Sequence, residues 1–210
     1  MGELLTCNTS RLRAEVAAHV AADQVVQGTY WHTQNQHGCF IGCLSHDHKG
    51  SPEIVEARYG IPVMLQRIAE SIFERLPAEE AVAFFAAFPD AVGCDGKGLS
   101  CVGWQFLLAE LRSLPPQSEE IQGVIDPVIA GLDQLARGLT WDQAAADAAA
   151  GAARAARAAA DAEWAAAGAA DAARAAAGAE WAARAAGDAV TRRQRDLLLR
   201  LIAEAEVRRG

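Results

Sequence analysis

Two cysteines and two histidines lie within ten residues of one another: Cys39, Cys43, His46 and His48. Zinc is commonly held by four such side chains in a tetrahedron, and the Cys–x3–Cys spacing falls within known ligand spacings. The His–x–His half is less usual as a ligand spacing. One of its two rings can point away, which leaves a three-ligand site with an open position. These four residues therefore form the candidate metal site of the sequence, with zinc as the possible cofactor.

Two other interpretations of this cluster stay open. In the first, Cys39 or Cys43 is a nucleophile with His46 as its base and Asp47 nearby, which requires a spatial pairing that a local sequence does not show. In the second, both cysteines are small buried residues on one helical face, while His46 and His48 are solvated in a loop. Free cysteine is among the most buried residue types, which favours this second interpretation.

The five cysteines are an odd number, and the N-terminal residues carry acid and arginine where a signal peptide has an apolar stretch. We therefore expect reduced thiols and a cytoplasmic protein rather than a disulfide framework. Cys94 and Cys101 are alternative, distant metal ligands. No run of the sequence approaches the ~20 apolar residues of a membrane span.

The charge balance argues against nucleic acid as the direct partner. The formal net charge is −8, and residues 1–139 hold 9 Lys or Arg against 17 Asp or Glu. Binding to a phosphate backbone requires a basic face. Residues 190–210 are the only basic part, with 6 Lys or Arg against 3 Asp or Glu.

The elements that must position the cluster are predicted to be helices, and no period-two pattern indicates a strand. Residues 28–60 are expected to be irregular, with a short helix around Pro52 to Arg58. The carboxylates of Glu70, Glu74, Glu79 and Glu80 are expected on a solvated helix face. Capping residues, prolines and apolar spacing place the other helices at about 9–26, 62–76, 77–88, 101–114 and 118–137.

Composition divides the chain into a globular helical domain, 1–139, and an Ala-rich segment with a basic C-terminal helix, 140–210. Between residues 144 and 189, 30 of 46 residues are Ala, which has the highest helix propensity. The other residues follow one another at steps of three or four and so lie along one stripe of a helix. The predicted fold is therefore an all-α, compact helical domain with a long Ala-rich helical extension, packed back as a hairpin.

Two tryptophans of that stripe, Trp164 and Trp181, have two interpretations. Aromatic residues at helical spacing are commonly core, which favours packing within the chain. Alternatively they bind another protein together with Arg174 and Arg184, since Trp is enriched at binding hot spots. The pattern also permits a homo-oligomer through the Ala-rich helices.

Several sequence blocks resemble a family of bacterial and phage proteins. They are QGTY within 27–30, GCFIGC at 38–43 and YGIP at 59–62, together with the Ala-rich helical C-terminal segment. The resemblance covers most of the chain, although residues 50–58 and 94–101 depart from it. It implies a phage or mobile-element setting, and implies no activity, cofactor or catalytic residue.

Three functions follow as hypotheses. The first is a non-catalytic protein-binding inhibitor of a bacterial defence system, for example an anti-CRISPR, whose acidic surface covers a basic nucleic-acid channel. The second is a small zinc- or thiol-dependent enzyme that uses Cys39, Cys43, His46 and His48. The third is an immunity protein that neutralises a toxin. The expected partner is a protein in the first and third cases, with no membrane involved.

Overall fold

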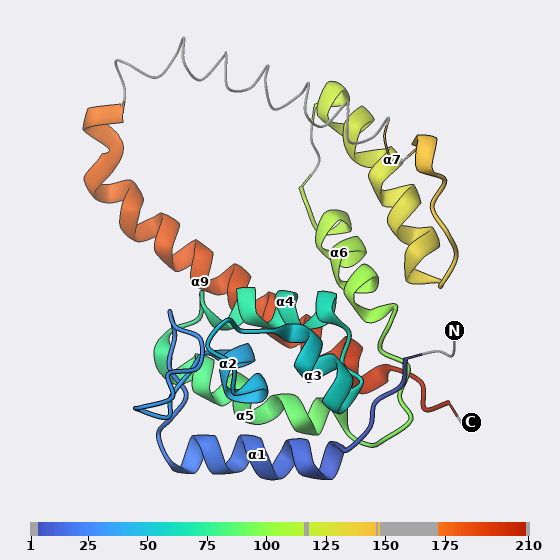
Figure 1. Ribbon diagram of the computed structural model, residues 1–210. Helices are drawn as coiled ribbons and strands as arrows, with labels where there is room; N and C mark the ends of the chain where they lie inside the picture. The colour runs from blue at the N-terminus through green and yellow to red at the C-terminus, as the bar shows by residue number, and fades with distance from the viewer. Residues whose placement is uncertain (1–3, 116–117, 146, 148–171, 209–210) are drawn as a thin grey trace. The chain divides into compact units, whose positions relative to one another are not determined.

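The described part of the chain folds into helices joined by loops in the computed structural model (Figure 1). The structure describes residues 4–115, 118–145, 147 and 172–208. Within these residues, pairing of extended backbone is limited to isolated bridges, and no strand forms. The predicted all-α class is confirmed. In the same described ranges, no helix has both the length and the apolar character that crossing a bilayer requires.

Contacts divide the chain into two units, Met1–Gly103 with Asp188–Gly210, and Trp104–Gly187. The boundary at residues 139 and 140 drawn from composition stays a prediction about domains. The first unit contains α1 (Thr9–Ala21), α2 (Phe40–Ser45), α3 (Pro52–Tyr59), α4 (Val63–Phe73) and α5 (Ala78–Val92). Helix α6 (Val102–Arg112) begins at the boundary, α7 (Glu119–Ala136) lies in the second unit, and α9 (Ala172–Glu204) starts in the second and ends in the first.

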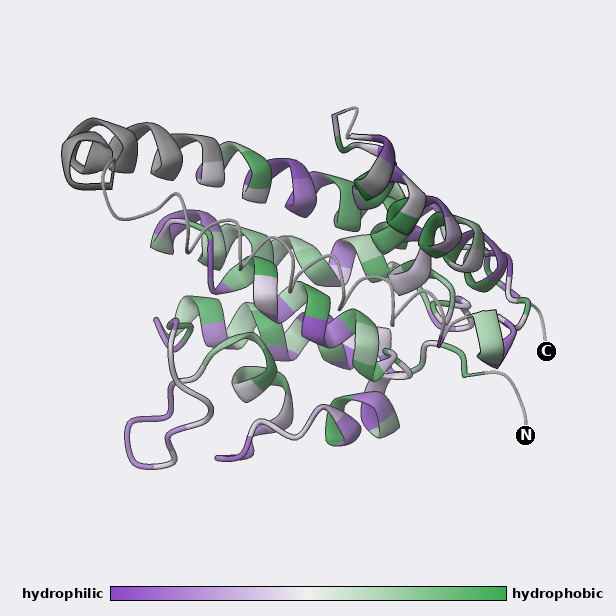
Figure 2. Ribbon diagram, turned by 90° about the horizontal axis from the view of Figure 1, so that it is seen from above, coloured by the Kyte–Doolittle hydropathy of each residue, from purple (hydrophilic) through white to green (hydrophobic). Residues whose placement is uncertain are grey.

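Phe40 of α2 lies at the centre of the core of the first unit. Its ring centroid is 4.9 to 6.1 Å from those of four other phenylalanines on α4 and α5, which are Phe73, Phe84, Phe85 and Phe88. All six residues of α2 are buried. The expectation that residues 28–60 are irregular apart from a helix near Pro52 is therefore wrong for α2. Figure 2 shows hydrophobic and hydrophilic residues interspersed along the helices around it.

Helix α1 ends earlier than predicted, at Ala21 rather than Val26, because the chain turns back in a left-handed cap. Asp23 has a φ of 55°, its N–H donates to Val20 O, and Gln24 N donates to His19 O. These two bonds are those of a Schellman motif. Pro89 was expected to end α5, but the helix continues to Val92. The proline removes only one backbone N–H donor this close to the helix end, so the last turn still forms.

Lys97 joins the ends of two helices in the first unit. Its buried ammonium donates to Ala91 O of α5 at 3.2 Å, and to Ile202 O and Ala203 O of α9 at 3.1 and 2.8 Å. Carbonyls at helix C-termini lack intrahelical donors and carry partial negative charge, so a cation stabilises both ends. The backbone of Lys97 also pairs with Thr6, and the neighbouring Gly98 N donates to Glu206 O. The N-terminal and C-terminal segments therefore both contact this loop.

Within the first unit, the C-terminal part of α9 is buried through apolar residues. Leu198 and Ile202 are fully buried, and Leu197 is 9% exposed. Arg192 and Arg195 both donate to the carboxylate of Glu80 on α5, at 2.8 and 3.1 Å. Residues 148–171 lie outside the described part, so the predicted hairpin of the Ala-rich segment stays a prediction.

Candidate functional site

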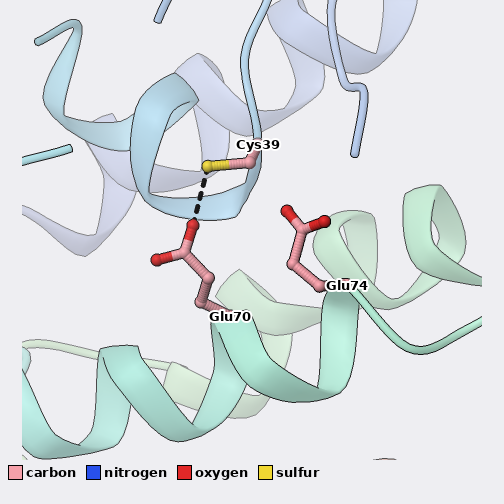
Figure 3. Close-up of side chains that lie close together, drawn as sticks. All are labelled: Cys39, Glu70 and Glu74. Atoms are coloured by element: carbon pink, nitrogen blue, oxygen red, sulfur yellow. Dashed lines mark hydrogen bonds between the residues drawn. The ribbon is translucent and has the colours of Figure 1, made fainter. Parts of the chain in front are cut away.

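Cys39 precedes α2, and its thiol faces α4 (Figure 3). Its backbone N–H donates to Thr29 O at 2.7 Å, which fixes the chain at this point. A Cβ on Gly42, one turn into α2, would lie 2.8 Å from Trp31 N. Glycine therefore permits residues 30 and 31 to pass against the helix, and this close passage positions Thr29 beside Cys39.

Glu70 on α4 and Glu74, the residue that caps its C-terminus one turn later, lie on the side that faces Cys39 (Figure 3). The thiol of Cys39 donates to Glu70 Oε1 at 2.7 Å. Glu74 Oε2 accepts from the N–H of Gly28 at 2.8 Å. One ligand atom from each of Cys39, Glu70 and Glu74 lies within 4.8 Å of the other two.

Glu70 is a buried carboxylate with an incomplete set of partners. The residue is 8% exposed, and Oε2 accepts no hydrogen bond from the residues that the structure describes. Its nearest positive charge is Arg67 Nη1, 3.6 Å from Oε2. A buried carboxylate oxygen is costly without a donor or a cation, and Arg67 meets this requirement only in part at 3.6 Å. A metal ion would fit beside this oxygen as a closer partner.

Burial sets the protonation of the site in the absence of an ion. It raises the pKa of the Cys39 thiol, and the carboxylate of Glu70 raises it further. Burial also raises the pKa of Glu70, while the hydrogen bond from Cys39 and the charge of Arg67 oppose this shift. Cys39 is therefore a neutral thiol at pH 7, which argues against a free thiolate nucleophile.

A pocket of about 620 Å³ opens beside the three residues. Besides Cys39, Glu70 and Glu74 it is lined by Gly28, Thr29, Tyr30, His48, Arg67 and Ser71. A cation held by the thiol and the two carboxylates would have a coordination position accessible from this pocket. The arrangement can therefore present a metal-bound water or ligand to a small molecule.

The structure separates the four ligands predicted from the sequence. Cys39 and His48 line the same pocket. Cys43 is buried and donates to Gly38 O at 3.1 Å, and burial raises the pKa of its thiol to about 12. His46 Nε2 lies 2.8 Å from His19 Nε2. In the described ranges, the cluster of three metal-binding side chains that forms is Cys39 with Glu70 and Glu74.

The residues predicted to form a nucleophile with its base also have separate partners. His46 contacts His19, the thiol of Cys39 contacts Glu70, and Asp47 accepts from Ser51 Oγ at 2.5 Å. Burial, followed by the charge of His19, lowers the pKa of His46. The hydrogen-bond partner of His46 is therefore His19 on α1, and not Cys39 or Cys43.

The predicted partner-binding residues lie where the structure gives no side-chain detail. Trp164 lies outside the described residues. Arg174, Trp181 and Arg184 belong to α9, and only the backbone of the helix is described there. Their role in binding another protein stays a prediction.

Sequence reasoning missed Glu70, which was expected on a solvated helix face with Glu74, Glu79 and Glu80. The expectation is wrong for Glu70, because this residue lies on the buried side of α4 with Leu65, Ala69 and Phe73. A signal was present, since a charged residue interrupts the apolar spacing of residues 65–73 on its core side. A buried Glu requires a partner, and the partner here is Cys39.

No match to this chain was found among protein-family models, curated proteins or solved structures.

Proposed function

We propose that this protein binds a zinc ion through Cys39, Glu70 and Glu74. The observation that supports this most directly is the convergence of the three ligand atoms within 4.8 Å, at a buried carboxylate oxygen that has no hydrogen-bond donor among the described residues. Thiolates, imidazoles and carboxylates are the side chains that bind zinc in proteins. The thiol favours zinc over magnesium or calcium, which prefer sites made of oxygen alone.

Charge balance fits a divalent ion. A thiolate and two carboxylates carry three negative charges, and Arg67 at 3.6 Å from Glu70 Oε2 supplies one positive charge. A divalent ion brings the sum to zero. Deprotonation of Cys39 on binding follows from the same charge, because a metal-bound thiol loses its proton.

The chemistry of such a site is that of a zinc-dependent enzyme. Three protein ligands with a fourth, accessible position are the arrangement of catalytic zinc sites, whereas structural sites have four protein ligands. Arg67, Ser71 and His48 line the pocket onto which that fourth position would open. Zinc-assisted hydrolysis, in which bound water is the nucleophile, is the reaction class that this arrangement fits.

Metal analysis of the full chain, purified without chelators, tests the proposal. We expect about one zinc per chain, and after Co²⁺ exchange a thiolate-to-cobalt absorption band. Cys39→Ser should lose the ion and the band. Cys43→Ser is the matched control, because Cys43 is also a buried thiol and is outside the cluster.

Two outcomes contradict this assignment. Less than about one zinc per several chains removes the metal site. Equal loss of zinc in Cys39→Ser, Cys43→Ser and His46→Gln returns the ion to the four-ligand set Cys39, Cys43, His46 and His48 predicted from the sequence.

A second candidate function is a non-catalytic inhibitor of a bacterial defence system that acts in the cytoplasm by binding a protein. The acid surplus of residues 1–139, 17 Asp or Glu against 9 Lys or Arg, supports it, together with the resemblance to phage proteins. An acidic surface is complementary to the basic channel of a nuclease. An immunity protein has the same physical requirements, and the identity of the partner separates the two.

Binding to a captured defence complex under rising salt tests the charge mechanism. We expect the affinity to fall steeply between low and physiological ionic strength, because charges at an interface rim are screened. An affinity that ignores salt would overturn charge mimicry. Substitution of Trp164 and Trp181 by Ala tests whether the Ala-rich stripe binds the partner, because the affinity should then fall. Arg174 and Arg184 are the charged residues of the same predicted contact.

A further inference from the structure

Two histidines from separate elements meet at the end of α2 opposite Cys39. His19 lies on α1 and is 6% exposed, and His46 is the exposed residue that ends α2, with a φ of 54°. Their Nε2 atoms are 2.8 Å apart. Two imidazole lone pairs at this distance repel each other unless a proton or a metal ion lies between them.

The ring of His19 is oriented by a second contact. Its Nδ1 lies 2.8 Å from Gln24 Oε1, and a side-chain amide oxygen accepts hydrogen bonds only. Nδ1 therefore donates to Gln24, and Nε2 is the nitrogen that faces His46. Metal-binding histidines are fixed in this way, by an acceptor on the nitrogen that does not bind the metal.

Trp31 holds both rings in place. Its ring centroid lies 5.5 Å from that of His19, edge-on, and 4.6 Å from that of His46. The Schellman cap of α1 sets the position of Gln24, and the left-handed conformation of His46 turns its ring back toward α1. The two nitrogens are thus positioned before any ligand binds.

We propose that His19 and His46 bind a divalent transition-metal ion through their Nε2 atoms. Imidazole is a ligand for zinc, nickel and copper, and a zinc–nitrogen distance of about 2.0–2.1 Å in a tetrahedron requires a nitrogen–nitrogen separation of about 3.3 Å. An opening of about 0.5 Å from the observed 2.8 Å gives that separation. The ion replaces the single proton shared by the two nitrogens, and the exposure of His46 leaves its other coordination positions to water.

The carboxylate of Glu15, one turn before His19 on α1, is a negative charge that acts on His46. It already accepts from Arg11 Nη2 at 3.0 Å and from the hydroxyl of Tyr59, and Arg58 Nη1 lies 3.8 Å from it. This carboxylate is therefore engaged, and the ion is held by two histidines alone. Imidazole suits nickel, copper and zinc alike, and an ion with only two protein ligands is held less tightly than one in a three-ligand site.

The site shares no residue with the zinc site proposed at Cys39, Glu70 and Glu74. The two lie at opposite ends of α2, Cys39 before its first residue and His46 after its last. A failure of either proposal therefore leaves the other in place, and variants of the two sites distinguish the failures.

Titration of the full chain with Ni²⁺ tests the second site, in a Cys39→Ser background that removes the thiol of the first. Ni²⁺ binds imidazole and does not oxidise the exposed thiol of Cys94. Calorimetry gives the affinity, and quenching of Trp31 fluorescence reports binding at this place. We expect one bound ion, and at least a tenfold weaker affinity in His46→Gln, whose exposed position preserves folding.

His37→Gln is the matched control, because His37 also stacks on a second histidine: its ring centroid lies 5.4 Å from that of the exposed His32. Its affinity should equal that of the parent. Trp31→Phe should lose the quenched signal and keep the heat of binding. Equal affinity in His46→Gln and the parent, or loss of binding in His37→Gln, would overturn the proposal and leave the His19–His46 contact as a hydrogen bond only.

Discussion

Gly42 is the residue on which the geometry of the candidate site depends most directly. A Cβ there would lie 2.8 Å from Trp31 N and 2.9 Å from the carbonyl carbon of Tyr30. Both neighbours are backbone atoms, so neither can turn aside. We expect Gly42→Ala to lower the free energy of unfolding by about 1–3 kcal/mol, the usual cost of overpacking, as measured by urea denaturation.

Gly123→Ala is the control for that substitution. Gly123 lies within α7 with no atom within 4 Å of a built Cβ. Alanine is favoured over glycine in a helix by about 1 kcal/mol, so stability should stay or rise. A Gly42→Ala variant as stable as the parent would show that residues 30 and 31 do not pass against α2.

The residues of the two proposed metal sites differ in how far the sequence could predict them. Cys39 stood out because a second cysteine follows four residues later. Glu70 lies 31 residues away, and nothing in the local pattern joins it to a thiol. His46 was predicted as a ligand, but its partner His19 is 27 residues distant. Contacts of this range follow from the packing of α1, α2 and α4, which local spacing does not encode.

Helix α1 receives its N-terminal cap from a distant loop. Asn8 at the cap position is left-handed, and its side chain donates to Arg58 O at 2.8 Å rather than capping the helix. Asp95 Oδ1 instead accepts from Thr9 N at 2.8 Å. Removal of a side-chain cap costs about 1 kcal/mol. We expect Asp95→Ala to lower the free energy of unfolding at pH 7 by that amount, measured by urea denaturation.

The same contact predicts a pH dependence. The hydrogen bond from Thr9 N lowers the pKa of Asp95 below its unfolded value of about 3.9. The ionised carboxylate therefore contributes stability above pH 4, and this contribution is lost as the pH falls through the lower folded pKa. The stability difference between the parent and Asp95→Asn should shrink from pH 6 to pH 2. A constant difference would contradict the assignment of Asp95 as the cap.

Lys97 stabilises two helix ends at once. Its ammonium donates to three carbonyls in a buried position, and Lys97→Met leaves all three without this donor. Hydrogen bonds to charged groups contribute about 1.5–3 kcal/mol, and we expect a loss of about 3 kcal/mol in urea denaturation. Lys49 is exposed, and Lys49→Met should change stability by less than about 0.5 kcal/mol. Similar small effects in both variants would contradict the bridging role.

Proline marked the starts of two helices, and both predicted starts are within one residue of the observed ones. Pro62 and Pro77 directly precede α4 and α5, since fixed φ and a missing N–H suit the beginning of a helix. Helix α2 was missed because it has six residues, all buried, and hence no polar face to give a helical period. A period of 3.6 requires both faces to be represented over more than one turn.

At the scale of the whole molecule, the contacts group the C-terminal residues with the N-terminal hundred. Composition sets residues 140–210 apart, yet Asp188–Gly210 belongs to the first unit. Charge contained a signal of this, because residues 190–210 carry 6 Lys or Arg against 3 Asp or Glu and residues 1–139 are acidic. The ion pairs of Arg192 and Arg195 with Glu80 are where these opposite charges meet.

Leu198 tests whether the end of α9 is part of the core of the first unit. Its side chain is fully buried, so Leu198→Ala removes buried methyl groups and leaves a cavity. We expect a loss of about 3 kcal/mol in the free energy of unfolding, whereas Val207→Ala, at a residue 52% exposed, should change it by less than about 0.5 kcal/mol. Urea denaturation measures this loss. A second measurement, the hydrogen exchange of the amides of α1 and α5 in Leu198→Ala, shows whether these two helices depend on α9. Faster exchange in α1 and α5 shows that these helices depend on α9. Unchanged exchange there would mean that the first hundred residues hold their fold without it, as a composition boundary at residue 139 predicts.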